Sequence, residues 1–186
     1  VKEMFGQPGL HGEVRTDGFP LPLLLAFVPG AMGAKGQLDL SGSFSGSLLD
    51  PKPQIRLVMN DGMFKYQPTS VSYENIDIDV KLTPGRVFVD VASLDALPLI
   101  RNPLDLVFKP NVSKDRLVSG KRNLVASGSI ALDGWKPGEL ALSIEARRLW
   151  AIYTQEIKAQ VGGKLTVDGV WPDIHINGTL DVDEVN

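Results

Sequence analysis

The side chains that could hold a metal ion gather in one short stretch near the C-terminus. Asp173, His175 and Asn177 alternate with apolar residues, so a strand would place all three on one face. A metal site draws three or four ligands from converging elements, whereas this stretch offers one imidazole and one carboxylate. The sequence has one other histidine, His11. We interpret the stretch as the polar face of a strand and predict no metal.

Paired carboxylates and glycine motifs likewise fail to match a calcium site, a catalytic nucleophile or a phosphate-binding loop. Asp77 and Asp79, and the acidic residues at 181–184, lack the loop and the distal glutamate of a calcium site. The Gly-Ser-Phe-Ser-Gly stretch at 42–46 has a phenylalanine where a nucleophile elbow has its serine. Gly120-Lys121 lacks the first glycine of a phosphate-binding loop. We therefore expect no catalytic residues, no cofactor and no enzymatic activity.

Composition narrows the class of protein further. The 186 residues carry a formal net charge of −3, which argues against a nucleic-acid partner because the phosphate backbone attracts a basic surface. Cysteine is absent, so disulfides, zinc thiolates and thiol nucleophiles are excluded. The chain begins with valine and shows no signal segment, which indicates a piece of a longer protein. Its longest apolar stretch is too short to span a membrane.

A seven-residue phrase, Gly-x-[Leu/Ile]-x-[Leu/Val]-x-Gly, occurs three times. Each copy alternates apolar and polar residues, which is the pattern of a strand with one buried face and one solvent-exposed face. The bounding glycines and the prolines that follow predict short strands joined by tight turns. The copies occupy residues 36–42, 128–134 and 163–169, with a partial fourth at 178–183.

The remaining elements follow from local signals. The Leu- and Pro-rich stretch at 19–29 predicts one short apolar helix that docks on the rest of the fold. Residues 73–91 predict a hairpin, Asn60-Asp61-Gly62 predicts another turn, and 104–108 a further strand. Residues 109–123 predict a basic loop. We expect an N-terminal segment (1–35) followed by one continuous β-domain (36–186).

The expected fold class is all-β, with a long, mainly antiparallel sheet in sequential order. Helical crossovers, which parallel strand pairs need, are not evident after residue 36. Periodicity leaves two ways to bury the apolar side of such a sheet. The sheet packs on another sheet as a sandwich, or it curls into a half-pipe or barrel with an apolar lumen.

The order of these motifs resembles the AsmA-like family, in particular the C-terminal region of its translocation and assembly module (TamB-type) members. The resemblance covers about residues 19–182, and residues 109–123 have no counterpart in it. The elements that carry it are the Leu-rich segment ending at Pro29-Gly30, the repeat at 36–42, Tyr-Glu-Asn-Ile-Asp-Ile at 73–78, Ser-Gly-Ser-Ile-Ala-Leu at 127–132, and the Gly/Trp-Pro run at 163–182.

The resemblance implies an elongated open half-pipe (β-taco) lined with aliphatic side chains, in a Gram-negative periplasm. The parent protein would be anchored in the inner membrane by a segment absent here. Its partners would be phospholipid acyl chains, a TamA-like Omp85-family outer-membrane barrel, and unfolded outer-membrane protein clients. The implied function is phospholipid movement between the two membranes, together with outer-membrane protein assembly.

On this hypothesis the alternating aliphatic side chains line a lipid-binding groove, whereas an ordinary closed core would use the same residues. A second hypothesis is a polypeptide-holding scaffold that adds client strands by β-augmentation. A third is a carbohydrate-binding sandwich that uses the three tryptophans. The predicted groove residues are Leu38, Leu40, Ile55, Leu57, Ile76, Ile78, Val80, Val87, Val89, Val91, Ile130, Leu132, Leu140, Leu142, Leu165, Val167, Ile174 and Ile176.

Overall fold

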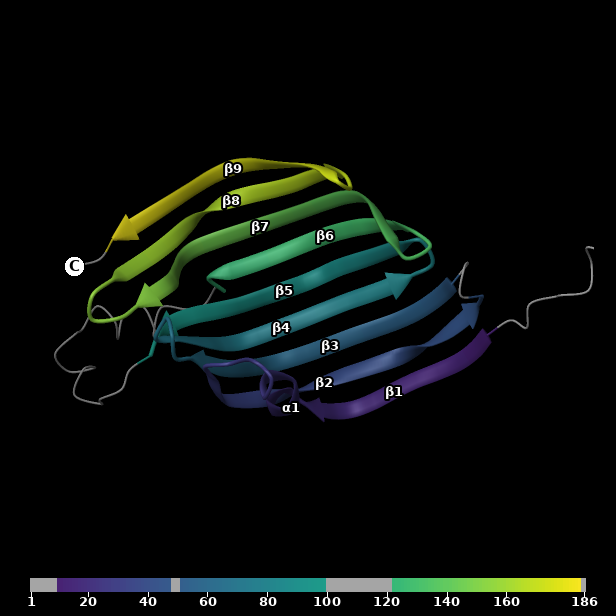
Figure 1. Ribbon diagram of the computed structural model, residues 1–186, viewed down its shortest axis with the longest axis horizontal. Coiled ribbons are helices and arrows are strands. Elements are labelled where there is room, and N and C mark those ends of the chain that lie inside the picture. Colours follow the sequence, from purple (N-terminus) through teal and green to yellow (C-terminus); the bar gives the residue numbers. More distant parts are fainter. Residues whose placement is uncertain (1–9, 48–50, 100–121, 185–186) are drawn as a thin grey trace, which may run out of the picture.

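The computed structural model describes residues 10–47, 51–99 and 122–184, and this part of the chain is almost entirely β-structure (Figure 1). The prediction of an all-β fold with one short helix is confirmed. The elements are β1 (Leu10–Pro20), α1 (Leu21–Leu25), β2 (Ala31–Gly46), β3 (Pro51–Tyr66), β4 (Val71–Thr83), β5 (Arg86–Pro98), β6 (Leu124–Asp133), β7 (Lys136–Tyr153), β8 (Lys158–Val170) and β9 (Asp173–Glu184).

The nine strands form one antiparallel sheet in which every strand pairs with its neighbours in sequence (Figure 1). The predicted sequential order is therefore confirmed. The sheet is not closed, because β1 and β9 lie at its two edges. The described residues contain no second sheet, so the sandwich, one of the two packings that periodicity left open, is not the fold of this part of the chain. The predicted boundary between residues 35 and 36 falls inside β2, and β1 belongs to the same sheet.

The strands are longer than the repeat predicted. Gly36 and Gly42 both lie inside β2, and Gly163 and Gly169 both lie inside β8. The prediction that these glycines bound short strands was wrong. Residues 60–62 do not form the predicted hairpin turn either. They lie within β3, where the pairing with β4 shifts register and Asp61 has a positive φ of 52°. The turn-forming residues here make a β-bulge instead of a reversal.

The repeat glycines sit where two backbones approach too closely for a side chain. A Cβ placed on Gly128 would lie 2.1 Å from the carbonyl oxygen of Ala141 on β7. Gly42 and Gly163 show the same approach, each at 2.1 Å from a carbonyl oxygen of the adjacent strand. All three have positive φ, between 143° and 158°, which side chains rarely allow. The repeat therefore encodes points of close strand contact.

The predicted hairpin is present, and the predicted helix is present but shorter than expected. β4 and β5 pair across a tight turn from Thr83 to Arg86, as predicted for residues 73–91. The helix is confined to Leu21–Leu25, shorter than the predicted 19–29, because Phe19 and Pro20 belong to β1. Pro22 lies in its first turn, where its missing N–H costs no hydrogen bond. The predicted strand at 104–108 and most of the predicted loop at 109–123 lie outside the described residues.

Contacts between strands that are not neighbours show that the sheet bends. Phe44 of β2 stacks on Trp135 in the β6–β7 turn, with ring centroids 6.3 Å apart. Four strand steps separate these strands, which is about 19 Å in a flat sheet. At the other ends of the strands, the Tyr153 N–H of β7 donates to the Thr69 carbonyl in the β3–β4 turn at 2.8 Å. Bending brings these distant positions into contact.

Two small clusters hold most of the buried hydrophobic side chains, and both involve the first half of β4. In the first, Leu21 of α1 packs against Met59 and Ile76. The predicted docking of the helix on the sheet is thereby confirmed. In the second, Trp150 packs against Val71 and Ala96. Tyr73 and Leu94 pack against both clusters. The two clusters together form one corner of tight packing on an otherwise single-layered sheet.

Replacing Gly128 by alanine tests the close strand approach. The new Cβ must displace the Ala141 carbonyl and adopt an unfavourable φ, so the unfolding free energy should fall by about 2–4 kcal/mol. Gly12→Ala is the matched control, because its added Cβ meets no atom within 4 Å. That control should change the unfolding free energy by less than about 0.5 kcal/mol. Urea denaturation measures both, and equal losses would contradict the interpretation.

Candidate functional site: the apolar face of the sheet

One face of the sheet carries three continuous rows of apolar residues that cross the strands. Directly paired residues in antiparallel strands project to the same face, so the register defines each row. Glycine and alanine interrupt the rows at a few positions. Row one is Leu38, Met59, Ile78, Ala92, Ala126, Ile144 and Leu165; row two is Leu40, Leu57, Val80, Val89, Gly128, Leu142, Val167 and Ile176; row three is Gly42, Ile55, Leu82, Val87, Ile130, Leu140, Gly169 and Ile174.

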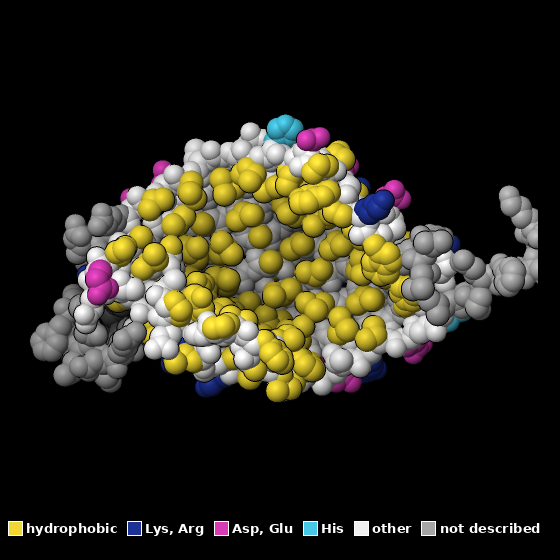
Figure 2. Space-filling view, viewed as in Figure 1, with side chains coloured by type: hydrophobic (Ala, Val, Ile, Leu, Met, Phe, Trp, Pro, Cys, Tyr) yellow, Lys and Arg dark blue, Asp and Glu magenta, His cyan; other side chains and the backbone are white. Residues whose placement is uncertain are grey.

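Figure 2 shows this face, with hydrophobic side chains gathered across most of it and charged side chains at its margins. Most row residues on β2 to β8 are half-buried by their neighbours. On the edge strand β9 the same face is open, and Ile176 is 67% exposed. Among the described residues, α1 is the one element outside the sheet, and it covers the corner around Met59. We call this surface the apolar face.

The predicted groove residues lie in the three rows, with the exception of Ile76, Val91 and Leu132. Ile76 belongs to the same face but is buried beneath α1 in the first cluster. Leu132 lies beyond an irregularity at the end of β6, where it pairs with Pro137. Sequence alternation thus places most of these side chains on one face.

Val91 is the one predicted groove residue that the structure places on the opposite face. Val89 pairs with Val80, but Val91 pairs with Asp79, so Asp90 is an extra residue between them. This bulge reverses the alternation along β5, and Val91 is 42% exposed beside the polar residues. The Val87, Val89 and Val91 alternation predicted a continuous apolar face because the sequence gives no sign of the bulge.

Several members of the apolar face were not among the predicted residues. Leu82 and Ile144 continue the alternation of strands that the sequence predicted, so the same periodicity could have found them. Met59 fell next to the incorrectly predicted turn at 60–62. Leu21 reaches this face from α1, and no periodic signal links a helix residue to a strand row. The docking of the helix was predicted, but the residue that makes the contact could be found only from the folded structure.

The opposite face is mainly polar, and several of its charged side chains are paired. Arg56 of β3 donates to Asp79 of β4 at 2.6 Å, and Lys81 pairs with Asp90. The hydrogen bond from Arg56 lowers the pKa of Asp79. His175 on β9 is exposed and pairs in register with Asp168. No group of three or more metal-ligating side chains occurs in residues 10–47, 51–99 and 122–184. The opposite face therefore presents a solvated surface.

A buried carboxylate joins β4, β5 and the start of β6. Asp95, with 0% exposure, accepts hydrogen bonds from the side-chain amide of Asn75 at 2.8 Å and from the Asn123 N–H at 3.0 Å. Arg122 donates to Asp95 at 3.4 Å and to Asp77 at 2.6 Å. A buried charge is tolerated when it is paired and hydrogen-bonded in this way. The cluster fixes the point at which the chain re-enters the sheet.

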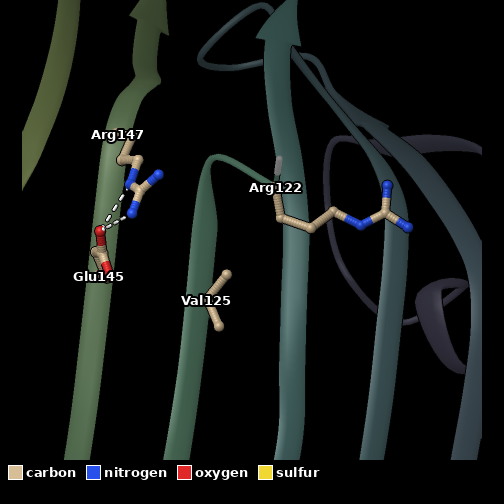
Figure 3. Close-up of a pocket in the computed structure, with 4 residues that line it drawn as sticks. All are labelled: Arg122, Val125, Glu145 and Arg147. Carbon is tan, nitrogen blue, oxygen red and sulfur yellow. Dashed lines mark hydrogen bonds and ion pairs between the residues drawn. The ribbon is translucent and has the colours of Figure 1, made fainter. Parts of the chain in front are cut away.

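Beside this cluster is a pocket of about 280 Å³, lined by Arg122, Val125, Glu145 and Arg147 (Figure 3). The Arg122 side chain extends away from the other three, toward its carboxylate partners (Figure 3). Arg147 donates to Glu145 at 2.6 Å. Both arginines are thus compensated within the protein. The pocket offers neither a nucleophile nor an uncompensated charge, so the apolar face remains the candidate site.

The pKa of Asp77 is set by opposing effects. Desolvation raises it, but the Asp61 N–H, the Arg122 hydrogen bond and the Arg122 charge together lower it below its ordinary 3.8. A carboxyl whose folded-state pKa is depressed stabilises the fold above its unfolded pKa. That contribution is lost as the pH falls through the folded-state value. Asp77 therefore stabilises the protein at neutral pH, and this contribution declines as the pH falls below 3.8 and is lost below the depressed folded-state pKa.

Comparison of the chain with protein-family models, with curated proteins and with solved structures finds no match. Within the described residues, no helix is both long enough and apolar enough to cross a bilayer. The function of the apolar face is therefore argued from its own geometry.

The Asp77→Asn variant tests the ionic cluster. At neutral pH it should lower the unfolding free energy by about 1–2 kcal/mol, because it removes a charge-assisted hydrogen bond from Arg122. The difference from wild type should shrink as the pH falls below 3.8 and vanish below the depressed folded-state pKa, where Asp77 of the folded wild type becomes protonated. Asp181→Asn, on the exposed strand β9, is the control. Denaturant titrations across the acid range measure the difference, and a pH-independent difference would contradict the assignment.

Proposed function

We propose that this chain is a section of a hydrophobic conduit that moves phospholipid between the inner and outer membranes of a Gram-negative bacterium. In this proposal the bent sheet forms an open half-pipe, and the apolar face is its lumen. The acyl chains lie on the three rows while the headgroup remains in water. The protein acts as a carrier surface and performs no covalent chemistry.

The observation that carries the proposal is an apolar face, eight strands wide, that the described residues leave largely uncovered. A soluble protein rarely leaves a continuous apolar surface of that size exposed unless the surface binds something. Row two crosses from β2 to β9, seven strand steps or roughly 34 Å. One leaflet of bilayer hydrocarbon is only about 15 Å thick. A whole acyl chain therefore fits along a row.

The chemistry of the rows suits a ligand that must move. Each buried CH₂ of an acyl chain gains about 0.8 kcal/mol, and this gain depends on area and not on direction. The three rows contain aliphatic residues, methionine, alanine and glycine, with no side chain that forms strong hydrogen bonds. A chain that slides by one strand step loses one set of contacts and gains an equivalent set.

Two further observations support the half-pipe shape. The Phe44–Trp135 stack and the Tyr153–Thr69 hydrogen bond bridge strands that are not neighbours, on opposite ends of the sheet. Both contacts require curvature. Curvature in a half-pipe also hides part of the apolar face from water, in agreement with the half-buried state of its central residues.

The order of the sequence motifs supports the cellular location and the partner in this proposal. It resembles that of AsmA-like proteins of the TamB type, and on that basis we propose a periplasmic location and an inner-membrane anchor elsewhere in the parent protein. The same resemblance suggests a TamA-like Omp85-family barrel as the partner. A role in outer-membrane protein assembly belongs to this part of the proposal.

Val89→Arg tests the lipid-binding surface, with Val91→Arg as a matched control two residues away. Val89 lies in the middle of row two, whereas Val91 lies on the opposite face. We expect wild type and Val91→Arg to retain co-purified phospholipid in native mass spectrometry after detergent-free purification. Val89→Arg should lose this phospholipid, because an acyl chain packed on the arginine would remove water from its charge, which is costly. Circular dichroism checks that all three proteins are folded.

Two results would contradict the conduit. One is a stable wild-type monomer without bound lipid that also takes up none from added phospholipid. The other is an unfolded Val89→Arg protein beside a folded Val91→Arg protein, which would show that the apolar face is a closed core.

The edge strands favour polypeptide holding as a second candidate function. Among the described strands, β9 pairs only with β8, so its other backbone edge has no partner within that part of the chain. β9 contains no proline and exposes Ile176, Leu180 and Val182. An extended client strand could add there by β-augmentation. Pro53, predicted to blunt a free edge, lies instead in the internal strand β3. Client binding that persists in Val89→Arg would favour this function over the conduit.

A further inference from the structure

We propose that the segment of residues 18–34, which we call the apolar tip, inserts into the surface of a lipid bilayer. The tip comprises the last residues of β1, the helix α1, the turns after it and the start of β2. Its use as the point at which lipid enters the conduit rests on the proposed function. Its contact with a bilayer does not.

The composition of the tip is the first observation. From Gly18 to Ala34 the chain contains only glycine, alanine, proline, leucine, valine, phenylalanine and methionine. No side chain in this stretch carries a charge or forms a strong hydrogen bond. Asp17 and Lys35 mark its ends. Such a stretch is stable in hydrocarbon without any partner for its side chains.

The second observation is that the tip projects its largest side chains into solvent. Phe27 is 87% exposed, the highest value among the exposed large hydrophobic residues, and Leu23 is 55% exposed. Leu24, Val28 and Met32 are also exposed. Leu21 alone is buried, where it packs on the apolar face. One side of the tip thus holds the sheet while the other side faces outward.

The third observation is that the base of the tip is fixed. The Gly18 N–H donates to the carboxylate of Asp39 at 2.7 Å, and the Gln67 N–H donates to the Gly30 carbonyl at 2.9 Å. Pro68 packs so closely on Gly30 that an added Cβ there would lie 2.7 Å away. The exposed side chains are therefore presented from a held base, which lowers the entropy cost of insertion.

Lysines stand where an inserted tip would meet lipid headgroups. Lys35 follows the apolar run directly, and Lys65 of β3 pairs in register with Met32. Neither lysine forms an ion pair within the described residues. Lysines at the margin of an apolar segment place their ammonium groups among anionic headgroups while their alkyl chains follow the apolar side chains. This charge pattern favours an anionic bilayer.

A lipid surface fits the tip better than a protein partner does. Protein interfaces carry about one hydrogen bond per 100–200 Å² and a polar rim, and the tip has no side chain to form them. A bilayer requires none. Leu21 also joins the tip to the apolar face, since it packs on Met59, the second residue of row one. A bilayer held at Phe27 would lie next to the start of the proposed conduit.

Vesicle flotation tests the tip. The probe is a vesicle of phosphatidylethanolamine and phosphatidylglycerol, incubated with the 186-residue chain. The double variant Leu23→Ser/Phe27→Ser should bind at least about tenfold more weakly than wild type. Val170→Ser is the matched control, because Val170 is 59% exposed but lies on β8, at the opposite end of the sheet. That control should bind as wild type does.

Substitution of a lysine gives a second test, which measures the electrostatic attraction to anionic lipid and not the burial of the apolar side chains. Lys65→Gln should weaken binding to the anionic vesicles by about fivefold and leave binding to pure phosphatidylcholine vesicles unchanged. Equal flotation of wild type and Leu23→Ser/Phe27→Ser would overturn the proposal. So would a wild-type dimer that the double variant converts to a monomer without a change in vesicle binding, because the tip would then be covered by a second copy.

A soluble probe separates this proposal from the conduit. Lysophosphatidylcholine, added below the concentration at which it forms micelles, reaches the apolar face without any bilayer. Equal lysolipid binding by wild type and by Leu23→Ser/Phe27→Ser, with weaker vesicle binding by the variant, supports both proposals. Vesicle binding through the tip without lysolipid binding by wild type supports the tip and rejects the conduit. Lysolipid binding without vesicle binding supports the conduit and rejects the tip.

Discussion

The register of the strand ladder is the constraint on which the rest of the structure depends. A slip of one residue turns every side chain of a strand to the other face, so three continuous apolar rows require each of the seven pairings from β2 to β9 to be correct. The close approaches at Gly42, Gly128 and Gly163 help to fix that register, because each admits only glycine. The glycines of the repeat thus determine which surface the valines and leucines form.

In the described part of the chain the sheet is a single layer, which must be stable without a second layer to pack against. Here the most buried side chains gather at one corner, where Leu21 and Trp150 cover the first half of β4. The ionic cluster around Asp95 adds a polar anchor near that corner. The rest of the apolar face is held by the hydrogen-bonded ladder and by contacts along the rows. Within the described residues, this division leaves much of the apolar face uncovered while one end of the sheet is firmly packed.

Much of the fold could be predicted from period-two alternation, because that pattern is imposed by the strand itself. It placed Leu40, Val80 and Leu142 on one face, and the lack of helical crossovers after residue 36 predicted the antiparallel order. It failed where the backbone departs from regular geometry. The bulge at Asp90 reverses the face of Val91, and the turn-like residues at 60–62 lie within β3. Such irregularities depend on the pairing of two strands, and a one-dimensional pattern does not contain the partner strand.

The stack of Phe44 on Trp135 links the curvature of the sheet to the environment of a fluorescent side chain. It joins two positions four strands apart, so the curvature of the sheet is coupled to one contact between two aromatic rings. If the sheet flattened to admit a bulky molecule, the rings would separate and Trp135 would enter a different environment. The fluorescence of Trp135, identified as the part of the tryptophan signal that a Trp135→Phe variant loses, therefore reports the width of the sheet without any attached label.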